Sequence, residues 1–427
     1  MAGRLRGKWR WLHPGMRVKR WLALFSLGLV LLSLGAALAF TRPMIDIVAA
    51  LGEFELAAAA GTACMVVGAA LALLGVYRLV RSITSAVAPR NGESLAERVY
   101  KHHQLDQGLN VVGIGGGTGL SALLRGLKQH TSNITAIVTV SDDGGSSGRL
   151  RRDLGTLAPG DIRNCIVALA DAEPLMGDWL QYRFDGAEPG LEGHSLGNLL
   201  IAGLTAISGD FLRGVQETSK VLNIRGRVLP ATVSRVTLCA ERADGSIARG
   251  ESQVCQSRSP IRRLFFEEGS PPALPEAVEA IRNAHVIVLG PGSTFTSLLP
   301  NLLVPDIARA VAESPAIKVL VCNVMTQPGE TDGFSASDHV RALVEYSRPG
   351  LVDYVLVNDE RPPAEATQRY QEEGAAFVEP DIGNIASMGL MPIKGRLLAD
   401  GGLVRHDPPK LADAVMRLAL EELALAH

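Results

Sequence analysis

The chain has 427 residues, of which 47% are hydrophobic and 20% charged, and its formal net charge is −2. Residues 1–100 carry a net charge of +7, and the remaining residues carry −9. An acidic body of this kind excludes nonspecific nucleic-acid binding, which needs a basic surface. The five cysteines are scattered and form no CxxC pair, which excludes a disulfide framework and a cysteine-based zinc site.

Two uncharged, apolar runs lie in the first part of the chain, at residues 21–40 and 56–77. Each is about long enough to cross the hydrocarbon core of a membrane as a helix. Basic residues lie outside both runs and the connector between them is net acidic, which places both ends in the cytoplasm. Residues 1–81 are therefore predicted to form a basic N-terminus and a transmembrane hairpin, which locates the protein at the cell membrane.

Each apolar run has an alternative interpretation. The first resembles a cleaved signal peptide, and the second resembles a buried helix of a soluble domain. The first run is longer than a usual signal core, and a second apolar run follows it before any folded domain, so the hairpin is favoured. Residues 82–108 are polar and contain Pro89 and Gly92, which is typical of a linker.

Short β-branched runs alternate with longer amphipathic runs in residues 109–427. The sequence predicts strands at residues 110–114, 134–140, 236–240, 284–289, 318–323 and 352–357. Helical periodicity between most of them predicts an α/β domain of the Rossmann-like type with a mostly parallel sheet. Ligands of such domains bind at the carboxyl ends of the strands.

The sequence VVGIGGGTGLS, at residues 111–121, runs from a predicted strand through a glycine loop into a predicted helix. Its candidate phosphate-binding residues are Gly115, Gly116, Gly117, Thr118 and Gly119. Glycine allows positive φ and removes Cβ atoms, so backbone N–H groups can approach a phosphate. The loop is neither a dinucleotide fingerprint nor a P-loop, because the third glycine and the Lys-Ser/Thr pair are missing. A tight turn without a ligand is the alternative.

Asp142 and Asp143 follow the next predicted strand, about 25 residues after the glycine loop. Carboxylates there can read a ribose or hold Mg²⁺ against the phosphates of a ligand. Mg²⁺ is thus the one cofactor suggested, with this pair as its candidate ligands. The neighbouring arginines, Arg149, Arg151 and Arg152, either close over an anion or are solvated on a surface turn.

Asp161 is predicted to be the N-cap of a helix whose first turn holds Arg163 and Asn164. Such a turn either faces a ligand or begins a buried helix.

His194, Ser195 and Asn198 begin a later apolar helix. A Ser/His hydrolase is an alternative here, but adjacent helical residues do not face each other and no GxSxG elbow is present. Capping by Ser195 and ligand contact by Asn198 are the favoured interpretation.

A second loop, GPGST, follows the buried strand predicted at residues 284–289. Its candidate phosphate-binding residues are Gly290, Gly292, Ser293 and Thr294. Two such loops on one sheet fit a diphosphate or a nucleotide better than a single carboxylate. Near the C-terminus, Arg405 and His406 are either anion ligands or ordinary surface charges.

Six motifs in this order carry a resemblance to a known family: GIGGGTGLSALLRGLK, SDDGGSSGRLRRDLG, PGDIRNCIVALADAEPLM, GHSLGN, VLGPGS and CNVMTQPGETDG. Together they resemble the YvcK-type gluconeogenesis factor family, which is similar to the 2-phospho-lactate transferases (CofD). The resemblance implies a regulator of cell shape and wall synthesis that binds a nucleotide sugar such as UDP-N-acetylglucosamine. The transferases instead join a nucleotide-activated phospho-lactate unit to a deazaflavin, with Mg²⁺.

For the site, the resemblance implies that Gly115–Gly119 and Gly290–Thr294 lie near phosphates. It also implies a polar cleft lining formed by Asp142, Asp143, Asp161, Arg163, Asn164 and Asn198, with Arg405 as a further nucleotide-sugar contact.

The expected function is therefore nucleotide-sugar binding and regulation without catalysis. A CofD-type transferase is the alternative, and an NAD-dependent oxidoreductase fits the fold but lacks a hydride-transfer residue set. The expected partners are a nucleotide sugar or another nucleoside diphosphate, the membrane, further copies of the chain and cell-wall synthesis proteins.

Overall fold

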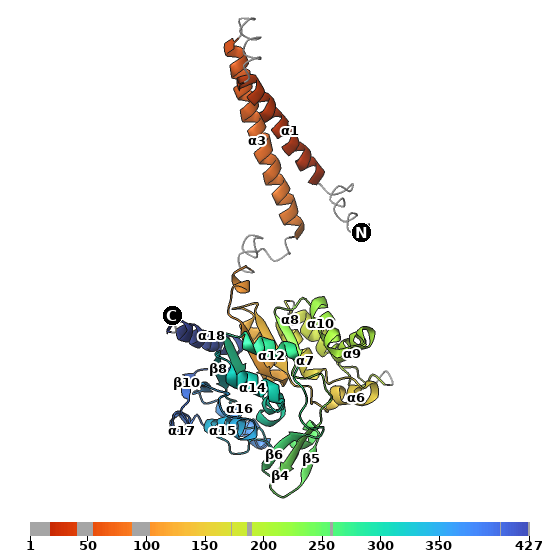
Figure 1. Ribbon diagram of the computed structural model, residues 1–427, viewed down its shortest axis with the longest axis vertical. Helices are drawn as coiled ribbons and strands as arrows, with labels where there is room; N and C mark the ends of the chain where they lie inside the picture. The colour runs from red at the N-terminus through yellow and green to blue at the C-terminus, as the bar shows by residue number, and fades with distance from the viewer. Residues whose placement is uncertain are drawn as a thin grey trace. The chain divides into compact units, whose positions relative to one another are not determined.

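The computed structural model describes residues 18–40, 54–87, 103–171, 173–185, 190–256, 259–401 and 403–425. The chain divides into two compact units, Met1–His102 and His103–His427. In the first unit, the described residues form two apolar helices, α1 (Val18–Phe40) and α3 (Phe54–Val87). The second unit has an α/β fold (Figure 1).

Helices α1 and α3 pack closely and antiparallel through glycine. Gly28 lies against Gly68 and Ala72, whereas Gly35, further along α1, lies against Gly61, earlier in α3. A Cβ on Gly28 would lie 2.6 Å from the backbone nitrogen of Ala72, so a side chain there would force the helices apart. Small residues of this kind allow apolar helices to approach each other in a membrane.

Within the described residues, one helical segment is long and apolar enough to cross a membrane, Ala59–Val80 in α3. The apolar part of α1, Trp21–Ala37, is shorter. Length and composition thus support the second predicted span, and the two-span hairpin stays a prediction. Helix α3 continues to Val87, past the predicted linker start at residue 82, because the helix-breaking Pro89 comes later.

A parallel seven-stranded sheet forms the centre of the second unit, in the order β10-β9-β8-β7-β1-β2-β3. Its strands are β1 (Val111–Gly115), β2 (Ile134–Val138), β3 (Arg227–Pro230), β7 (Val286–Leu289), β8 (Ile317–Val321), β9 (Tyr354–Asn358) and β10 (Met391–Gly395). The strand order reverses between β1 and β7, which is where folds of this class bind ligands. The predicted mostly parallel α/β fold is confirmed.

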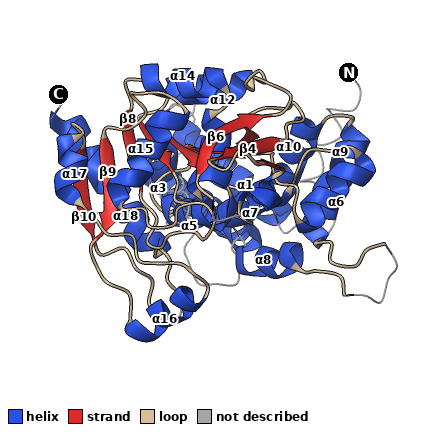
Figure 2. Ribbon diagram, turned by 90° about the horizontal axis from the view of Figure 1, so that it is seen from below, coloured by secondary structure: helices blue, strands red, loops and turns tan. Residues whose placement is uncertain are grey.

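Helices cover both faces of this sheet (Figure 2). On one face lie α5 (Gly117–Leu127), α7 (Gly160–Leu169) and α18 (Pro408–Leu425), and on the other α12 (Pro275–Arg282) and α14 (Pro305–Glu313). The other helices are α6 (Gly145–Leu154), α8 (Glu173–Gln181), α9 (Leu196–Ser208), α10 (Phe211–Val221), α11 (Glu251–Val254), the π-helical turn η2 (Thr294–Leu298), α13 (Leu299–Leu302), α15 (Ala336–Tyr346), α16 (Ala364–Glu372) and α17 (Ile382–Ser387). Because both faces are covered, β1, β2 and β7 are buried along their whole length.

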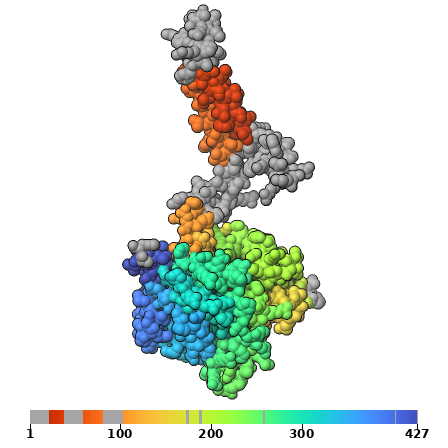
Figure 3. Space-filling view, viewed as in Figure 1, coloured from red at the N-terminus to blue at the C-terminus, as the bar shows by residue number. Residues whose placement is uncertain are grey.

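A second sheet is antiparallel and has three strands. The strand predicted at residues 236–240 is confirmed to within two residues as β4 (Leu238–Arg242), which pairs with β5 (Ile247–Arg249) and β6 (Ile261–Phe266) outside the main sheet. A turn at Gly245, with a φ of +81°, joins β4 to β5. The Asp-Gly pair at this turn is a hairpin signal. Figure 3 shows this sheet as a green projection at the lower edge of the second unit.

The five other predicted strands are confirmed to within two residues. All five cysteines are free thiols, and Cys165, Cys239 and Cys322 are buried.

Candidate functional site

The two glycine loops leave the same edge of the sheet. Strand β1 ends at Gly115 and β7 ends at Leu289, and these two strands pair directly in parallel. A Cβ on Gly119 would lie 2.4 Å from the carbonyl oxygen of Pro291, so the loops are also in contact. The loops therefore lie side by side at the switch point of the sheet.

Part of the glycine content of the first loop has a packing cause. A Cβ on Gly116 would lie 2.4 Å from Oδ2 of Asp161, and Gly117 has a φ of +60°, which favours glycine. Gly115 is the buried last residue of β1. Chain packing thus accounts for glycines that the sequence alone explained by the approach of a phosphate.

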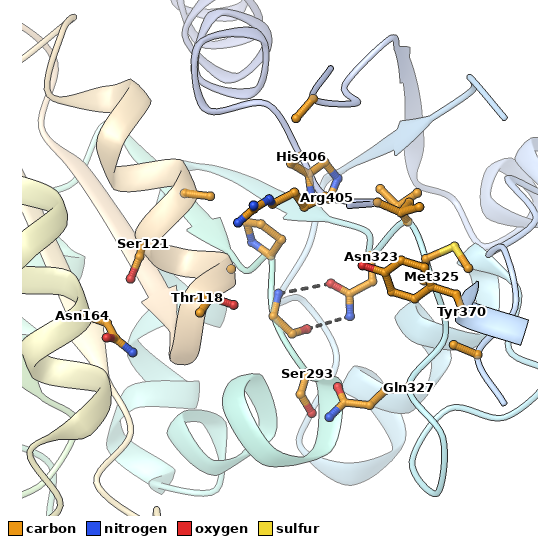
Figure 4. A pocket seen from close by; sticks show the side chains of 18 of the residues that line it. Thr118, Ser121, Asn164, Ser293, Asn323, Met325, Gln327, Tyr370, Arg405 and His406 are labelled. Carbon is orange, nitrogen blue, oxygen red and sulfur yellow. Dashed lines mark hydrogen bonds between the residues drawn. The ribbon is translucent and has the colours of Figure 1, made fainter. Parts of the chain in front are cut away.

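A cleft of about 810 Å³ opens where the two loops meet (Figure 4). Figure 4 shows Asn164 and Tyr370 at opposite ends, with Thr118 and Ser293 between them. Seven of the predicted site residues line the cleft: Thr118, Gly119, Arg163, Asn164, Gly292, Ser293 and Arg405. The volume is in the range of sites for small organic ligands and cofactors.

The other predicted site residues do not line the cleft: Gly115, Gly116, Gly117, Asp142, Asp143, Asp161, Asn198, Gly290 and Thr294. Gly290 adopts a φ of +82° before Pro291, and Thr294 is the buried first residue of η2. Both residues are buried, so they shape the second loop without facing the cleft.

Positive charge dominates the cleft. Among the described residues, its lining contains the arginines Arg125, Arg163, Arg183 and Arg405 and one carboxylate, that of Glu373. A concave site lined by charges of one sign concentrates ligands of the opposite sign. The cleft therefore suits an anionic ligand.

Asn323, just after β8, holds the second loop in place. Its Nδ2 donates to the carbonyl oxygen of Gly292 at 2.8 Å, and its Oδ1 accepts from the Gly292 N–H at 3.2 Å (dashed lines in Figure 4). Two hydrogen bonds to one residue fix the backbone that faces the cleft. Sequence reasoning missed Asn323, although its position at the carboxyl end of the strand predicted at residues 318–323 was an available signal.

A buried carboxylate engages the hydroxyl group of Ser293. The Ser293 hydroxyl donates to Glu330 and accepts from the Thr296 N–H at 3.1 Å. Glu330 also accepts from the thiol of Cys255 at 3.0 Å and from the Phe295 N–H at 3.3 Å. Burial raises the pKa of Glu330, and these hydrogen bonds oppose the rise. The Ser293 hydroxyl is thus committed to the protein, which leaves backbone groups of this loop for a phosphate.

The carboxylates of Asp142 and Asp143 accept hydrogen bonds from backbone N–H groups. Oδ1 of Asp142 accepts from the Gly144 N–H at 2.8 Å, and Oδ1 of Asp143 accepts from the Ser252 N–H at 2.9 Å. Across the described ranges, no group of three or more His, Cys, Asp or Glu side chains is arranged to hold a metal ion. The pair is therefore an incomplete ligand set for Mg²⁺, which stays a prediction.

Asp161 lies in the first turn of α7, whose N-cap is Pro159. The prediction that Asp161 is the N-cap is wrong by two positions. Its carboxyl group instead supports the first glycine loop through a hydrogen bond with the backbone of Gly117. Burial, followed by the charge of Asp142, raises the pKa of Asp161 to about 6.

Arg163 connects α7 to the start of α9 through neutral acceptors. Its guanidinium donates to Oγ of Ser195 at 2.5 Å, to Oδ1 of Asn198 at 3.1 Å and to Oδ1 of Asn164 at 2.8 Å. Ser195 also caps α9, as predicted, by accepting from the Asn198 N–H. Asn198 is therefore buried and positions Arg163, while Arg163 itself lines the cleft.

His194 does not form a catalytic pair with Ser195. Its Nδ1 lies 3.0 Å from the hydroxyl of Ser146, and the Ser195 hydroxyl accepts from Arg163. Burial, followed by the charge of Arg149, lowers the pKa of His194. The contacts of this helix start thus argue against a Ser/His hydrolase.

Tyr370 lines the end of the cleft opposite Asn164, and Arg405 and His406 also belong to the lining (Figure 4). Burial lowers the pKa of His406 to about 4, so its imidazole is neutral near pH 7. Tyr370 offers an aromatic ring for packing against a flat ligand group. Sequence reasoning missed Tyr370, because a single tyrosine in a polar helix carries no pattern.

Comparison with known proteins identifies the family. The family model described as 2-phospho-L-lactate transferase CofD matches residues 111–398. A gluconeogenesis factor of Bacillus subtilis is 50% identical over 308 residues, which cover 72% of this chain and 97% of the relative. The chain belongs to the CofD family of gluconeogenesis factors. A relative from Nostoc sp. that bears the gluconeogenesis factor name is 45% identical over 419 residues, which cover 96% of this chain and 92% of the relative.

The crystal structure of a Bacillus halodurans protein supports the fold of the second unit. It matches with a TM-score of 0.69 and 49% identity, covering 72% of this chain and 99% of that chain. Since 72% of this chain covers nearly all of the B. subtilis relative as well, the family includes chains about as long as the second unit alone.

Proposed function

We propose that this protein binds a nucleotide sugar such as UDP-N-acetylglucosamine and acts by regulation rather than by catalysis. The observation that carries the proposal is the cleft at the β1/β7 switch point, where the two glycine loops and Arg405 line one cavity. Backbone N–H groups of the loops and the guanidinium of Arg405 together suit a diphosphate. The remaining length of the cleft leaves room for a base and a sugar.

The regulatory part of the proposal links carbon metabolism to cell shape and wall synthesis, with cell-wall synthesis proteins as partners. The gluconeogenesis factor names of the relatives support the first element of this link. The N-terminal unit would act as a two-span membrane anchor with both ends in the cytoplasm, which the apolar segment Ala59–Val80 supports for one span. Thiol labelling of cysteines placed in the connector and near residue 100 tests the anchor, because labelling of both from the same side would rule it out.

Titration calorimetry of the full chain in detergent with UDP-N-acetylglucosamine tests the binding proposal. We expect saturable binding that Arg405→Gln weakens about tenfold, because a charge-assisted contact to a phosphate is lost. Arg152→Gln is the matched control, since Arg152 is exposed and does not line the cleft. Absence of heat at high micromolar ligand would contradict the proposal.

A CofD-type transferase is the second candidate. The observation that favours it is the extent of the family match, which begins at β1 and ends after β10 and so includes both glycine loops. The assay supplies a deazaflavin, nucleotide-activated phospho-lactate and Mg²⁺ to the folded chain. Formation of the phospho-lactyl product would establish the transferase, and a silent assay would eliminate it for these substrates.

A further inference from the structure

The cleft extends along α5, away from the glycine loops. Thr118 and Arg125 both line it and are seven residues apart on this helix, which corresponds to about 10 Å along the helix axis. Beyond Thr118, the lining includes Arg125, Arg163 and Arg183. Three of the four cleft arginines thus lie outside the glycine loops, and they are also separate from the C-terminal segment that carries Arg405.

Arg163 is a buried cation in this part of the cleft. Arg163 is only 8% exposed, and its guanidinium donates hydrogen bonds to the uncharged oxygens of Ser195, Asn198 and Asn164. Its Nε has no hydrogen-bond partner within the described residues. A buried charge is costly unless an opposite charge or a full set of hydrogen bonds compensates for it.

Arg183 adds a second positive charge close to the first. After burial, the charge of Arg183 is the largest cause that lowers the pKa of Arg163, and the charges of Asp161 and Asp142 oppose it from behind. The guanidinium of Arg183 donates to the carbonyl oxygen of Gly193 at 3.1 Å. In the described part of the chain, neither arginine forms an ion pair with a carboxylate.

We propose that Arg163 and Arg183, together with Arg125, form a second oxyanion subsite in the cleft, separate from the glycine loops. It binds a carboxylate or phosphate that is carried either by the sugar of the nucleotide ligand or by a second molecule. The inference rests on the proposed function in one respect: the glycine loops are assumed to bind the diphosphate of the nucleotide. A guanidinium fork binds the two oxygens of such a group in a bidentate manner.

This subsite makes the ligand preference specific. A nucleotide sugar with a neutral sugar fills the glycine loops and leaves the subsite without an anion. An acidic group at the sugar end, or an anion bound beside the nucleotide, compensates the paired guanidinium charges. We therefore expect an acidic ligand to bind more tightly than its neutral counterpart.

Three calorimetric titrations of the full chain in detergent test the subsite. UDP-glucose and UDP-glucuronate differ in one carboxylate, and inorganic phosphate is titrated into protein saturated with UDP. We expect either about tenfold tighter binding of UDP-glucuronate than of UDP-glucose, which assigns the anion to the sugar, or binding of phosphate beside UDP, which assigns it to a second molecule.

Arg183→Gln should remove that preference or that phosphate binding and leave the affinity for UDP unchanged. Arg183 is exposed, so the substitution preserves the fold, and Arg152→Gln is again the control. Arg163→Lys, which keeps the charge but loses the fork, should reduce the effect about five- to tenfold.

The outcomes separate this inference from the proposed function. Binding of UDP with no preference for UDP-glucuronate and no phosphate binding overturns the subsite alone. Equal weakening of UDP by Arg183→Gln also overturns it, since Arg183 would then belong to the diphosphate site. Phosphate binding that Arg183→Gln removes, in a chain that does not bind UDP, supports the subsite and contradicts the proposed function. Absence of all binding contradicts both.

Discussion

Asp161 shows how one buried carboxyl group shapes the floor of the candidate site. It lies beneath Gly116 and bonds to the backbone of Gly117, so it supports the loop from the side opposite the cleft. Its position also explains why Gly116 cannot carry a side chain. The sequence placed Asp161 near the site correctly but assigned it the wrong task, because the cap was assigned from residue type alone.

The raised pKa of Asp161 predicts a pH-dependent contribution to stability. The pKa is about 6 in the folded chain against an ordinary value of 3.8, so the folded chain binds the proton more tightly than the unfolded chain. Stability therefore falls as pH rises from about 4 to about 6, by about 3 kcal/mol in total. Asp161→Asn removes this dependence while keeping an acceptor for the backbone bond.

Chemical denaturation of both chains at pH 4.5 and pH 7.5 measures this effect. The free energy of unfolding of Asp161→Asn, measured relative to that of the natural chain, should increase as pH rises. A difference that stays constant or decreases with pH would contradict the assignment of Asp161 as a buried, destabilised carboxylate.

Residues of the cleft differ in how far the sequence predicts them. Thr118 and Arg405 belong to recognisable motifs and line the cleft as expected. Arg183 and Tyr370 belong to no recognisable motif. Arg183 follows α8 and Tyr370 lies in α16, and only the tertiary packing of these segments brings the two side chains to the cleft.

At the scale of elements, the contact between α5 and the loop after β7 determines the geometry of the cleft. Gly119 in the first turn of α5 lies against Pro291, and Asn323 fixes Gly292 from the other side. The second loop is thus held between α5 and the end of β8. A change at Gly119 should therefore affect both stability and ligand binding.

Gly119→Ala tests this contact. The new Cβ would lie 2.4 Å from a backbone oxygen that cannot move freely, so we expect destabilisation by about 1–3 kcal/mol. Gly203→Ala is the matched control, because Gly203 lies within α9 with open space around it and should gain up to about 1 kcal/mol. Urea denaturation of each full-length variant measures both, and a Gly119→Ala chain as stable as the control would refute the contact.

The central strands were predictable, whereas the edges of the sheet were not. Buried parallel strands such as β1 and β7 read as continuous apolar runs bounded by glycine. The edge strands β3 and β10 were missed, because they are short and contain Pro230 and Pro392, and proline is tolerated at sheet edges while it weakens a strand signal. The strand β4 was predicted, but its place in a second sheet was not, since one strand alone does not reveal its partners.

At the scale of the whole molecule, the chain joins an apolar helix pair to a complete α/β unit of the CofD family. The second unit matches nearly the full length of shorter relatives, so its fold does not depend on the helices. The proposed anchor would therefore determine where the ligand is bound rather than which ligand is bound.

We propose that the paired glycine loops bind the diphosphate of a nucleotide sugar. A structure of the full chain with bound UDP-N-acetylglucosamine tests this binding mode most directly. We expect the diphosphate to lie between the backbones of Gly119 and Gly292, with Arg405 in contact and no nucleophile of the chain at the anomeric carbon. An ordered nucleotide whose diphosphate lies away from both loops, for example beside Asp142 and Asp143, would contradict it.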